Sequence, residues 1–165
     1  MDQHRRPLCF LLARAEGLFV AAFDARLAAA GYPDLSLAHS ANVLRFLQAG
    51  ELRPGQLVEL ACVTKQAVSQ QVAHLERFGY VTVRPDPRDS RARQIRLTAK
   101  GVTAQRVSAE LFTQIEQDWA TQIGAEQLGA LRALLESALP QLTDGSRPTG
   151  GPAVPLSLPA ATAGQ

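Results

Sequence analysis

The chain has 165 residues, a formal net charge of +2, 46% apolar residues and 19% charged residues, which suits one domain with a sizeable core, or one domain plus a tail. Two cysteines without a C-x-x-C pair or a His/Cys cluster exclude a disulfide-stapled secreted scaffold and give no metal site. No uncharged apolar run approaches the roughly 18 residues of a membrane span. Arg14 and Glu16 interrupt the N-terminal apolar stretch, which is poor for a signal peptide. We therefore expect a cytoplasmic protein with no membrane partner and no cofactor.

Most of the chain shows helical periodicity, with apolar residues recurring at spacings of three and four. Good N-cap residues, a helix-starting proline and terminating glycines set the limits of these segments. The helices are expected at 6–30, from Ser36 to Gly50, from Pro54, from Thr64 to Phe78, at 99–122 and at 125–139.

The period changes after Gly79. Residues 80–84 and 94–97 are β-branched and alternating, which predicts two short strands. The Pro/Asp-rich segment 85–91 between them predicts a loop, so the three pieces form a hairpin. From Pro140 the composition shifts, and 143–165 is rich in Pro, Gly, Ala, Ser and Thr, which predicts a disordered C-terminal tail.

Positive charge is concentrated in the middle of the sequence. Residues 51–100 hold nine Lys/Arg against five Asp/Glu, whereas the other 115 residues hold eight against ten. The hairpin alone carries Arg84, Arg88, Arg91, Arg93 and Arg96. A basic centre of this kind fits a polyanion partner, and a solvated loop would look the same on charge alone.

The segment 54–78 reads as helix, turn, helix, and its second helix has two different faces. One face is apolar, through Val68, Val72 and Leu75. The other face is polar but almost uncharged and carries Lys65, Gln66, Ser69, Gln70 and Ala73. A solvated face usually carries Glu/Lys pairs, whereas amides and small residues suit contact with base edges in a DNA groove. Thr64 and Lys65, at the helix start, are placed for phosphates.

A basic hairpin directly after a helix-turn-helix is a winged helix, in which an arginine of the wing can enter the minor groove. Five segments here resemble the MarR family of bacterial transcription regulators, continuously over about residues 54–101. They are Leu57–Ala61, Thr64–Gln70, Leu75–Val81, Arg84–Arg91 and Leu97–Gly101. The Asp-x-Arg of the wing followed by Leu-Thr-x-x-Gly is the specific part.

The resemblance implies a mainly α fold with a small β-hairpin wing. It implies one domain over residues 1–142, in which 1–35 and 99–142 are dimerisation helices and 36–98 is the winged helix-turn-helix lobe. It further implies a homodimeric repressor that binds the two half-sites of a pseudo-palindromic operator in double-stranded DNA. A small aromatic or amphipathic effector would release it. The wing arginine of the family matches Arg91 and its wing aspartate matches Asp89, which would brace Arg91 or the hairpin. The expected DNA-binding residues are Thr64, Lys65, Gln66, Ala67, Ser69, Gln70, Arg84, Arg88, Asp89, Ser90 and Arg91.

Other residues leave alternatives open. Cys9 resembles the oxidisable cysteine of the peroxide-sensing branch of this family, but the tyrosines of that branch are missing, and a packed core cysteine fits as well. Cys62 reads as a core residue. Phe19, His39 and Val43 are candidates for the effector pocket, although a lone histidine such as His39 is more often structural. We find no catalytic constellation, so we expect no enzyme.

Overall fold

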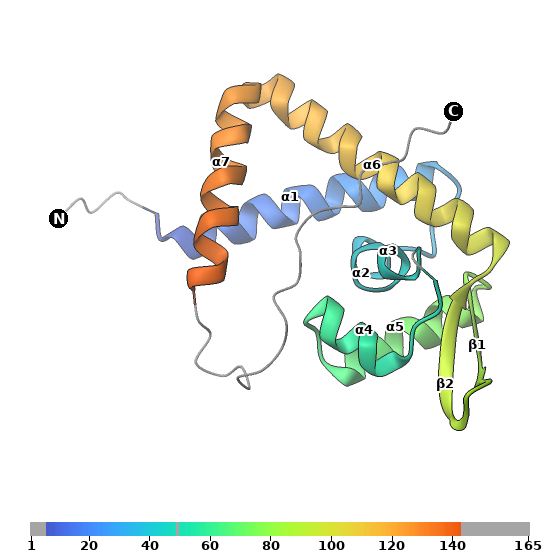
Figure 1. The fold of residues 1–165 in the computed structure, drawn as a ribbon. Coiled ribbons are helices and arrows are strands. Elements are labelled where there is room, and N and C mark those ends of the chain that lie inside the picture. The colour runs from blue at the N-terminus through green and yellow to red at the C-terminus, as the bar shows by residue number, and fades with distance from the viewer. Residues whose placement is uncertain (1–5, 49, 143–165) are drawn as a thin grey trace, which may run out of the picture. The chain divides into compact units, whose positions relative to one another are not determined.

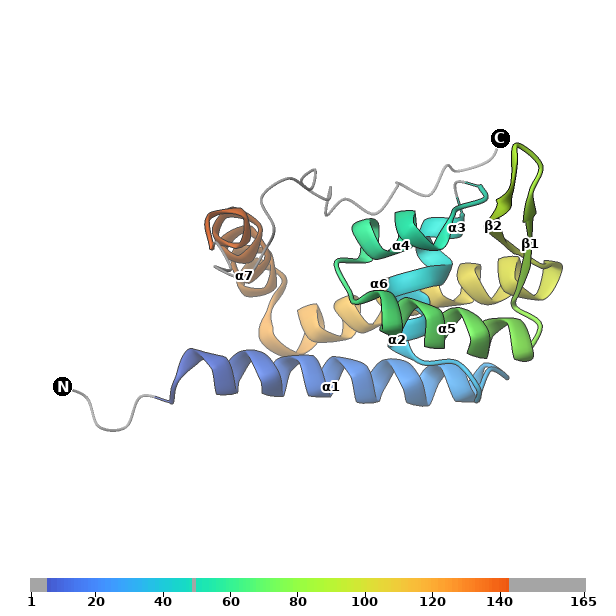
Figure 2. The same ribbon diagram turned by 90° about the horizontal axis from the view of Figure 1, so that it is seen from below.

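The structure is a computed structural model that describes residues 6–48 and 50–142 and, at position 90, the backbone only. The chain forms two compact units, residues 1–117 and 118–165, and Figure 1 and Figure 2 label their elements. The tail expected at 143–165 lies outside the described residues. The expected division into dimerisation helices and a winged lobe is not decided by these two units and stays a prediction.

The fold is mainly helical with one two-stranded antiparallel sheet, as the sequence predicts. The elements of the first unit are α1 (Leu8–Ala29), α2 (Leu37–His39), the π-helix η1 (Ser40–Leu44), α3 (Arg45–Leu47), α4 (Pro54–Ala61), α5 (Lys65–Arg77), β1 (Val81–Asp86), β2 (Asp89–Leu97) and most of α6 (Ala99–Ile123). The second unit holds the end of α6, α7 (Ala125–Ala138) and the 3₁₀ helix η2 (Leu139–Gln141). None of the described helices is both long and apolar enough for a membrane span.

The first unit has its core where the middle helices meet the hairpin. The fully buried large side chains include Leu44 from η1, Leu57 from α4, Leu75 from α5 and Tyr80 before β1. The C-terminal half of α1 packs on α6 through Phe23, whose ring centroid lies 4.7 Å from that of Phe112. This core fixes α4 and α5 against each other, and the hairpin stands beside the end of α5 (Figure 1).

The helix expected from Ser36 to Gly50 is not continuous. Ser36 does precede its first turn, but the middle of the segment is a π-helix over Ser40–Leu44. The Ser40 hydroxyl is buried there, 3.0 Å from the Ser108 hydroxyl of α6. A π turn differs from an α turn by a single residue, so the apolar spacing alone could not distinguish the two.

The hairpin is longer than predicted. The strands reach Asp86 and Asp89, so the loop expected over 85–91 shrinks to the turn Pro87-Arg88. The register runs from Val81↔Leu97 to Pro85↔Arg93 and then jumps to Asp86↔Asp89. Two aspartates stabilise this tip by accepting main-chain hydrogen bonds, a contribution that strand periodicity does not register.

The hairpin is also joined by an isolated β-bridge from the segment before α4. Leu52 pairs with Ile95 through two main-chain hydrogen bonds of 3.1 and 2.8 Å. At its other end the hairpin joins α6 through Thr98, which donates to the carbonyl of Gly79 at 2.6 Å. A Cβ at Gly101 would lie 2.0 Å from the carbonyl oxygen of Tyr80, which is a physical reason for the glycine in the Leu-Thr-x-x-Gly segment.

Candidate nucleic-acid interface

Helix α5 presents the two faces that the sequence predicts. Val68, Val72 and Leu75 are buried, and this anchors one face on the core. The side chains of Lys65, Gln66, Ser69, Gln70 and Ala73 are exposed, whereas Ala67 is partly buried at the edge of the face. The exposed face therefore offers two amides and a hydroxyl within little more than one helical turn.

The start of α5 is fixed by its own N-cap. Thr64 has an extended backbone, and its hydroxyl accepts the main-chain N–H of Ala67 at 3.1 Å. Cys62 ends α4 two residues earlier in the left-handed conformation, with a φ of 54°. This turn directs Cys62 outward, so its predicted place in the core is wrong and its thiol is exposed.

The C-terminal end of α5 is held by neighbouring segments. His74 donates from Nε2 to the carbonyl of Asp34 at 2.6 Å, and Tyr80 donates to the Asp34 carboxylate at 2.9 Å. Burial of Tyr80 raises the pKa of its hydroxyl, and Asp34 acts in the same direction. Because the loop at Asp34 contacts both the helix and the start of the wing, the orientation of α5 is set from both ends.

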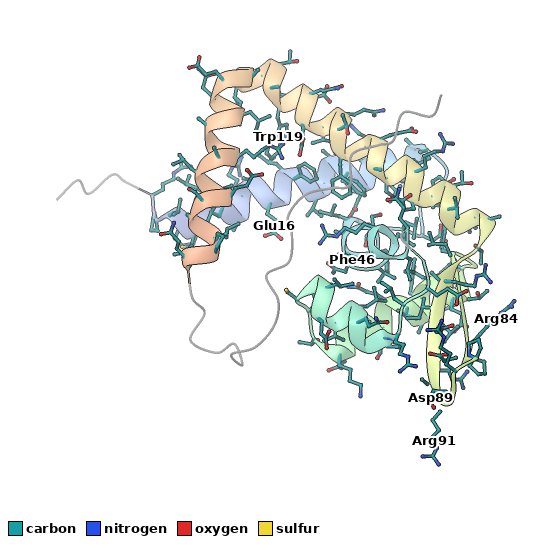
Figure 3. The ribbon with its side chains drawn as sticks, viewed as in Figure 1. Glu16, Phe46, Arg84, Asp89, Arg91 and Trp119 are labelled. Carbon is teal, nitrogen blue, oxygen red and sulfur yellow. The ribbon has the colours of Figure 1, made fainter. Side chains whose placement is uncertain are left out.

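The arginines of the hairpin lie outside the core. Arg84, Arg88 and Arg91 are exposed, and Figure 3 shows Arg91 extending from the tip while Arg84 points away from the side of the wing. Asp89 lies at the same tip, where its Oδ1 accepts the main-chain N–H of Arg91 at 3.1 Å. Asp89 thus braces the backbone of Arg91, one of the two roles expected for it. The side chain of Ser90 lies outside the described part of the structure.

Sequence reasoning missed an aspartate of the wing that forms a buried side-chain ion pair. Asp86 is 3% exposed, and its Oδ2 accepts two hydrogen bonds from the guanidinium of Arg53, at 2.9 and 2.6 Å. Its Oδ1 accepts the main-chain N–H of Arg88 at 2.8 Å. These bonds, that of Arg88 first, lower the pKa of Asp86. Only its place in the Asp-Pro turn pointed to Asp86, since the partner lies 33 residues away.

The remaining candidates lie apart from this interface. Val43 is fully buried, Phe19 stacks on Phe112 with ring centroids 5.9 Å apart, and His39 stacks on His74 at 4.4 Å. None of the three lines a surface pocket of about 210 Å³ between α3, β2 and α6. Cys9 is exposed on the first turn of α1. The described residues contain no group of three His, Cys, Asp or Glu side chains that could hold a metal.

The sequence was also compared with models of known protein families. Residues 34–92 match the family model described as MarR family. Over this segment the chain is similar to the MarR family. The matched segment starts at the Asp34 loop and ends in the wing, so it spans the helix-turn-helix and most of the hairpin. Comparison with curated proteins returned no match.

Several solved structures share the fold of this chain. The reduced form of MarR from E. coli is 24% identical with a TM-score of 0.71, over 84% of this chain and 100% of that one. The S. aureus MepR–DNA complex is 21% identical with a TM-score of 0.71 over the same shares. The transcriptional regulator PA4135 is 28% identical with a TM-score of 0.65, over 85% and 100%. The winged-helix fold predicted from the sequence is therefore confirmed, and the family is one of transcription regulators.

Proposed function

We propose that this chain is a sequence-specific DNA-binding repressor that acts as a homodimer on a pseudo-palindromic operator and catalyses no reaction. The observation that supports this most directly is the exposed amide-rich face of α5 beside a wing with exposed arginines. Such a face can enter a major groove while the wing meets the neighbouring minor groove. The relatives MarR and MepR have been solved with DNA, MarR with operator DNA.

Each part of the interface has a distinct role in this proposal. Gln66 and Gln70 would read base edges, since a glutamine amide can pair with adenine through both of its polar atoms. Thr64, Lys65 and Ser69, together with Ala67 at the edge, would set the position of the helix on the backbone. Arg91 would enter the minor groove, with Arg84 and Arg88 on flanking phosphates, Asp89 bracing the tip and Ser90 beside it.

The homodimer is supported by apolar side chains that the single chain leaves exposed. In the first unit, Leu8, Leu11, Leu12 and Leu18 of α1 are 45–69% exposed. In the second unit, Leu131 and Leu134 of α7 are 42% and 67% exposed, and α7 buries none of its residues. Monomers rarely expose such runs, so both helices are expected to be covered by a second copy.

An effector would act by favouring one spacing of the two DNA-binding lobes over another. A small aromatic or amphipathic molecule near Phe19, His39 and Val43 is our proposal for a cytoplasmic repressor of this kind. Oxidation of Cys9 is the alternative, because the thiol is exposed at the start of α1. The two modes differ in whether oxidant alone releases DNA.

The test is a binding titration of the purified protein against the DNA upstream of its own coding sequence, with Arg91→Ala as the variant. Loss of a groove arginine costs about 1–3 kcal/mol, or roughly fivefold to 150-fold in affinity, and lowers the salt slope by about one. Arg106→Ala is the matched control, because Arg106 pairs with Glu110 on the exposed surface of α6. We expect the control to bind within about twofold of the wild type, as exposed ion pairs contribute little.

Equal affinities for wild type, Arg91→Ala and Arg106→Ala would contradict the wing's role in binding. The same titration with an organic hydroperoxide separates the two modes of regulation. Release of wild-type protein but not Cys9→Ser would assign the switch to Cys9. Binding that is indifferent to oxidant would favour a small-molecule effector.

A further inference from the structure

The start of α4 is tied to the tip of the wing by one ion pair. Arg53 directly precedes α4, and its Nε and Nη2 both donate to Oδ2 of Asp86, at the end of β1. The Asp86 side chain is only 2% exposed, whereas that of Arg53 is 45% exposed. A carboxylate buried to this degree needs its partners, because an unpaired buried charge is costly.

The same carboxylate orders the turn that follows it. Oδ1 of Asp86 accepts the main-chain N–H of Arg88, and Asp89 accepts that of Arg91 at the start of β2. The register jump between Pro85 and Asp86 leaves residues 90–92 without a paired residue on β1. Arg91 therefore lies on a bulged segment whose position depends on these side-chain contacts more than on the strand ladder.

A second attachment lies next to the first. Leu52 is paired with Ile95 in the middle of β2, so Leu52 and Arg53 hold the wing at two heights. By contrast, Arg96 on the same strand pairs with Glu51 at 3.3 Å, with both side chains 40% or more exposed. That pair is a surface contact of small energetic weight, and it provides a comparison within the same wing.

We propose that Arg53 and Asp86 are positioning residues: they fix the wing tip to the helix-turn-helix, so that Arg91 meets DNA at a set place relative to α5. This inference rests on the proposed DNA-binding function and names residues outside its expected contact set. Holding the tip in the free protein lowers the cost of ordering it on binding. The pair thus acts on DNA affinity through Arg91, without itself touching a base.

A double-mutant cycle tests this coupling. In the wild-type wing, Arg53→Ala is expected to weaken DNA binding about tenfold, because the tip loses its anchor. In the Arg91→Ala background the same change should alter affinity by no more than about twofold, since the positioned group is already gone. Arg96→Ala removes an equal charge from the same wing, so it measures the electrostatic loss alone. The proposal would be overturned if Arg53→Ala lowered DNA affinity only as much as Arg96→Ala does. It would also be overturned if Arg53→Ala lowered affinity equally with and without Arg91.

Asp86→Ala is the more decisive variant, because a purely electrostatic role and a positioning role predict opposite changes in DNA affinity. Removing a negative charge beside a polyanion should tighten binding, whereas losing the tip anchor should weaken it. We expect weaker binding, by about the same tenfold as for Arg53→Ala. Tighter binding would show that Asp86 acts only as a charge. If Asp86→Ala fails to fold, Arg53→Ala carries the test, since its half-exposed side chain can be removed without opening a core.

Amide hydrogen exchange in the free protein tests, without DNA, whether Arg53 anchors the wing tip. In Arg53→Ala the amides of Arg88 and Arg91 should exchange faster than in the wild type, while those of Leu52 and Ile95 should not change. Unchanged exchange at the tip would overturn the anchoring. If the wild type binds no DNA while the tip does loosen in the variant, the proposed function fails and the anchoring stands.

Discussion

The helix-turn-helix region and the terminal helices differ in how far their large apolar side chains are buried. Between Asp34 and Gly101, large apolar side chains such as Leu57, Leu75 and Ile95 are fully buried within one chain. The first half of α1 and the whole of α7 have no buried residue. The first region completes its own core, whereas the second exposes leucines at helical spacing.

The polar groups follow the same division. The first region is cross-linked by side chains distant in sequence, with His74 and Tyr80 both meeting Asp34 and Arg53 meeting Asp86. In α7, the Ser137 hydroxyl donates to the carbonyl of Leu134, three residues earlier in the same helix. The buried leucines and distant side-chain bonds of the first region support the homodimer proposed above, in which a second chain would cover the exposed leucines of the other region.

The largest expected effect is on dimer association through the exposed leucines of α7. Leu131→Glu combined with Leu134→Glu should dissociate the dimer, because four leucines per dimer would lose about 1.5 kcal/mol or more each. That sum of about 6 kcal/mol weakens association by roughly 10⁴-fold. Sedimentation equilibrium on the wild type and the double variant measures the change.

Val102→Glu is the control for that experiment. Val102 is 55% exposed, comparable with the two leucines, but it lies on α6 near the wing. We expect this variant to remain a dimer. A wild type that stays monomeric at all concentrations would contradict the difference drawn between the two regions.

The next largest expected effect is a loss of stability in the first region, at the close contact between Gly101 and the main chain of Tyr80. Gly101→Ala places a Cβ 2.0 Å from the carbonyl oxygen of Tyr80, and main chain cannot move aside as a flexible side chain does. We expect a loss of about 3 kcal/mol in the free energy of unfolding, at the upper end of overpacking effects. Gly55→Ala in α4 meets no atom within 4 Å, so it should be neutral or slightly stabilising. Denaturant melts of both variants would contradict this contact if their midpoints moved equally.

How far the sequence could predict this molecule depends on the range of the interactions. Helix ends follow local rules, so Pro54 and Thr64 begin α4 and α5 as expected, and the faces of α5 follow from its spacing. The broken second helix, the outward Cys62 and the β-bridge at Leu52 could not be predicted in this way. Each depends on a partner distant in sequence or on a single backbone angle.

The interface shows the same limit. The exposed side of α5 and the arginines of the wing could be found from residue type and order alone. The pair Arg53–Asp86 could not, because neither residue has a helical or strand spacing to the other. A basic residue before α4 and an aspartate in an Asp-Pro turn are common surface choices, and only the fold brings them together.

The smallest expected effect is on how the free energy of unfolding of the first region depends on pH. Burial lowers the pKa of His39 to about 4, and the adjacent His74 acts in the same direction. Nδ1 of His39 accepts the main-chain N–H of Ser36 at 3.2 Å, so protonation would remove this cap. In the unfolded chain the pKa of a histidine is about 6.5. Between these values the unfolded state binds more protons, so stability is full above pH 6.5 and falls towards pH 4.

His39→Gln isolates this contribution, since glutamine at the same helical position accepts the same N–H without titrating. We expect the free energy of unfolding of the wild type to fall more steeply than that of His39→Gln between pH 6.5 and 4, as measured by urea titrations at several pH values. Parallel curves would mean that His39 does not set the pH response. The expected difference would show that a half-buried cap in the first region makes its stability depend on pH, which the exposed leucines of α7 cannot do.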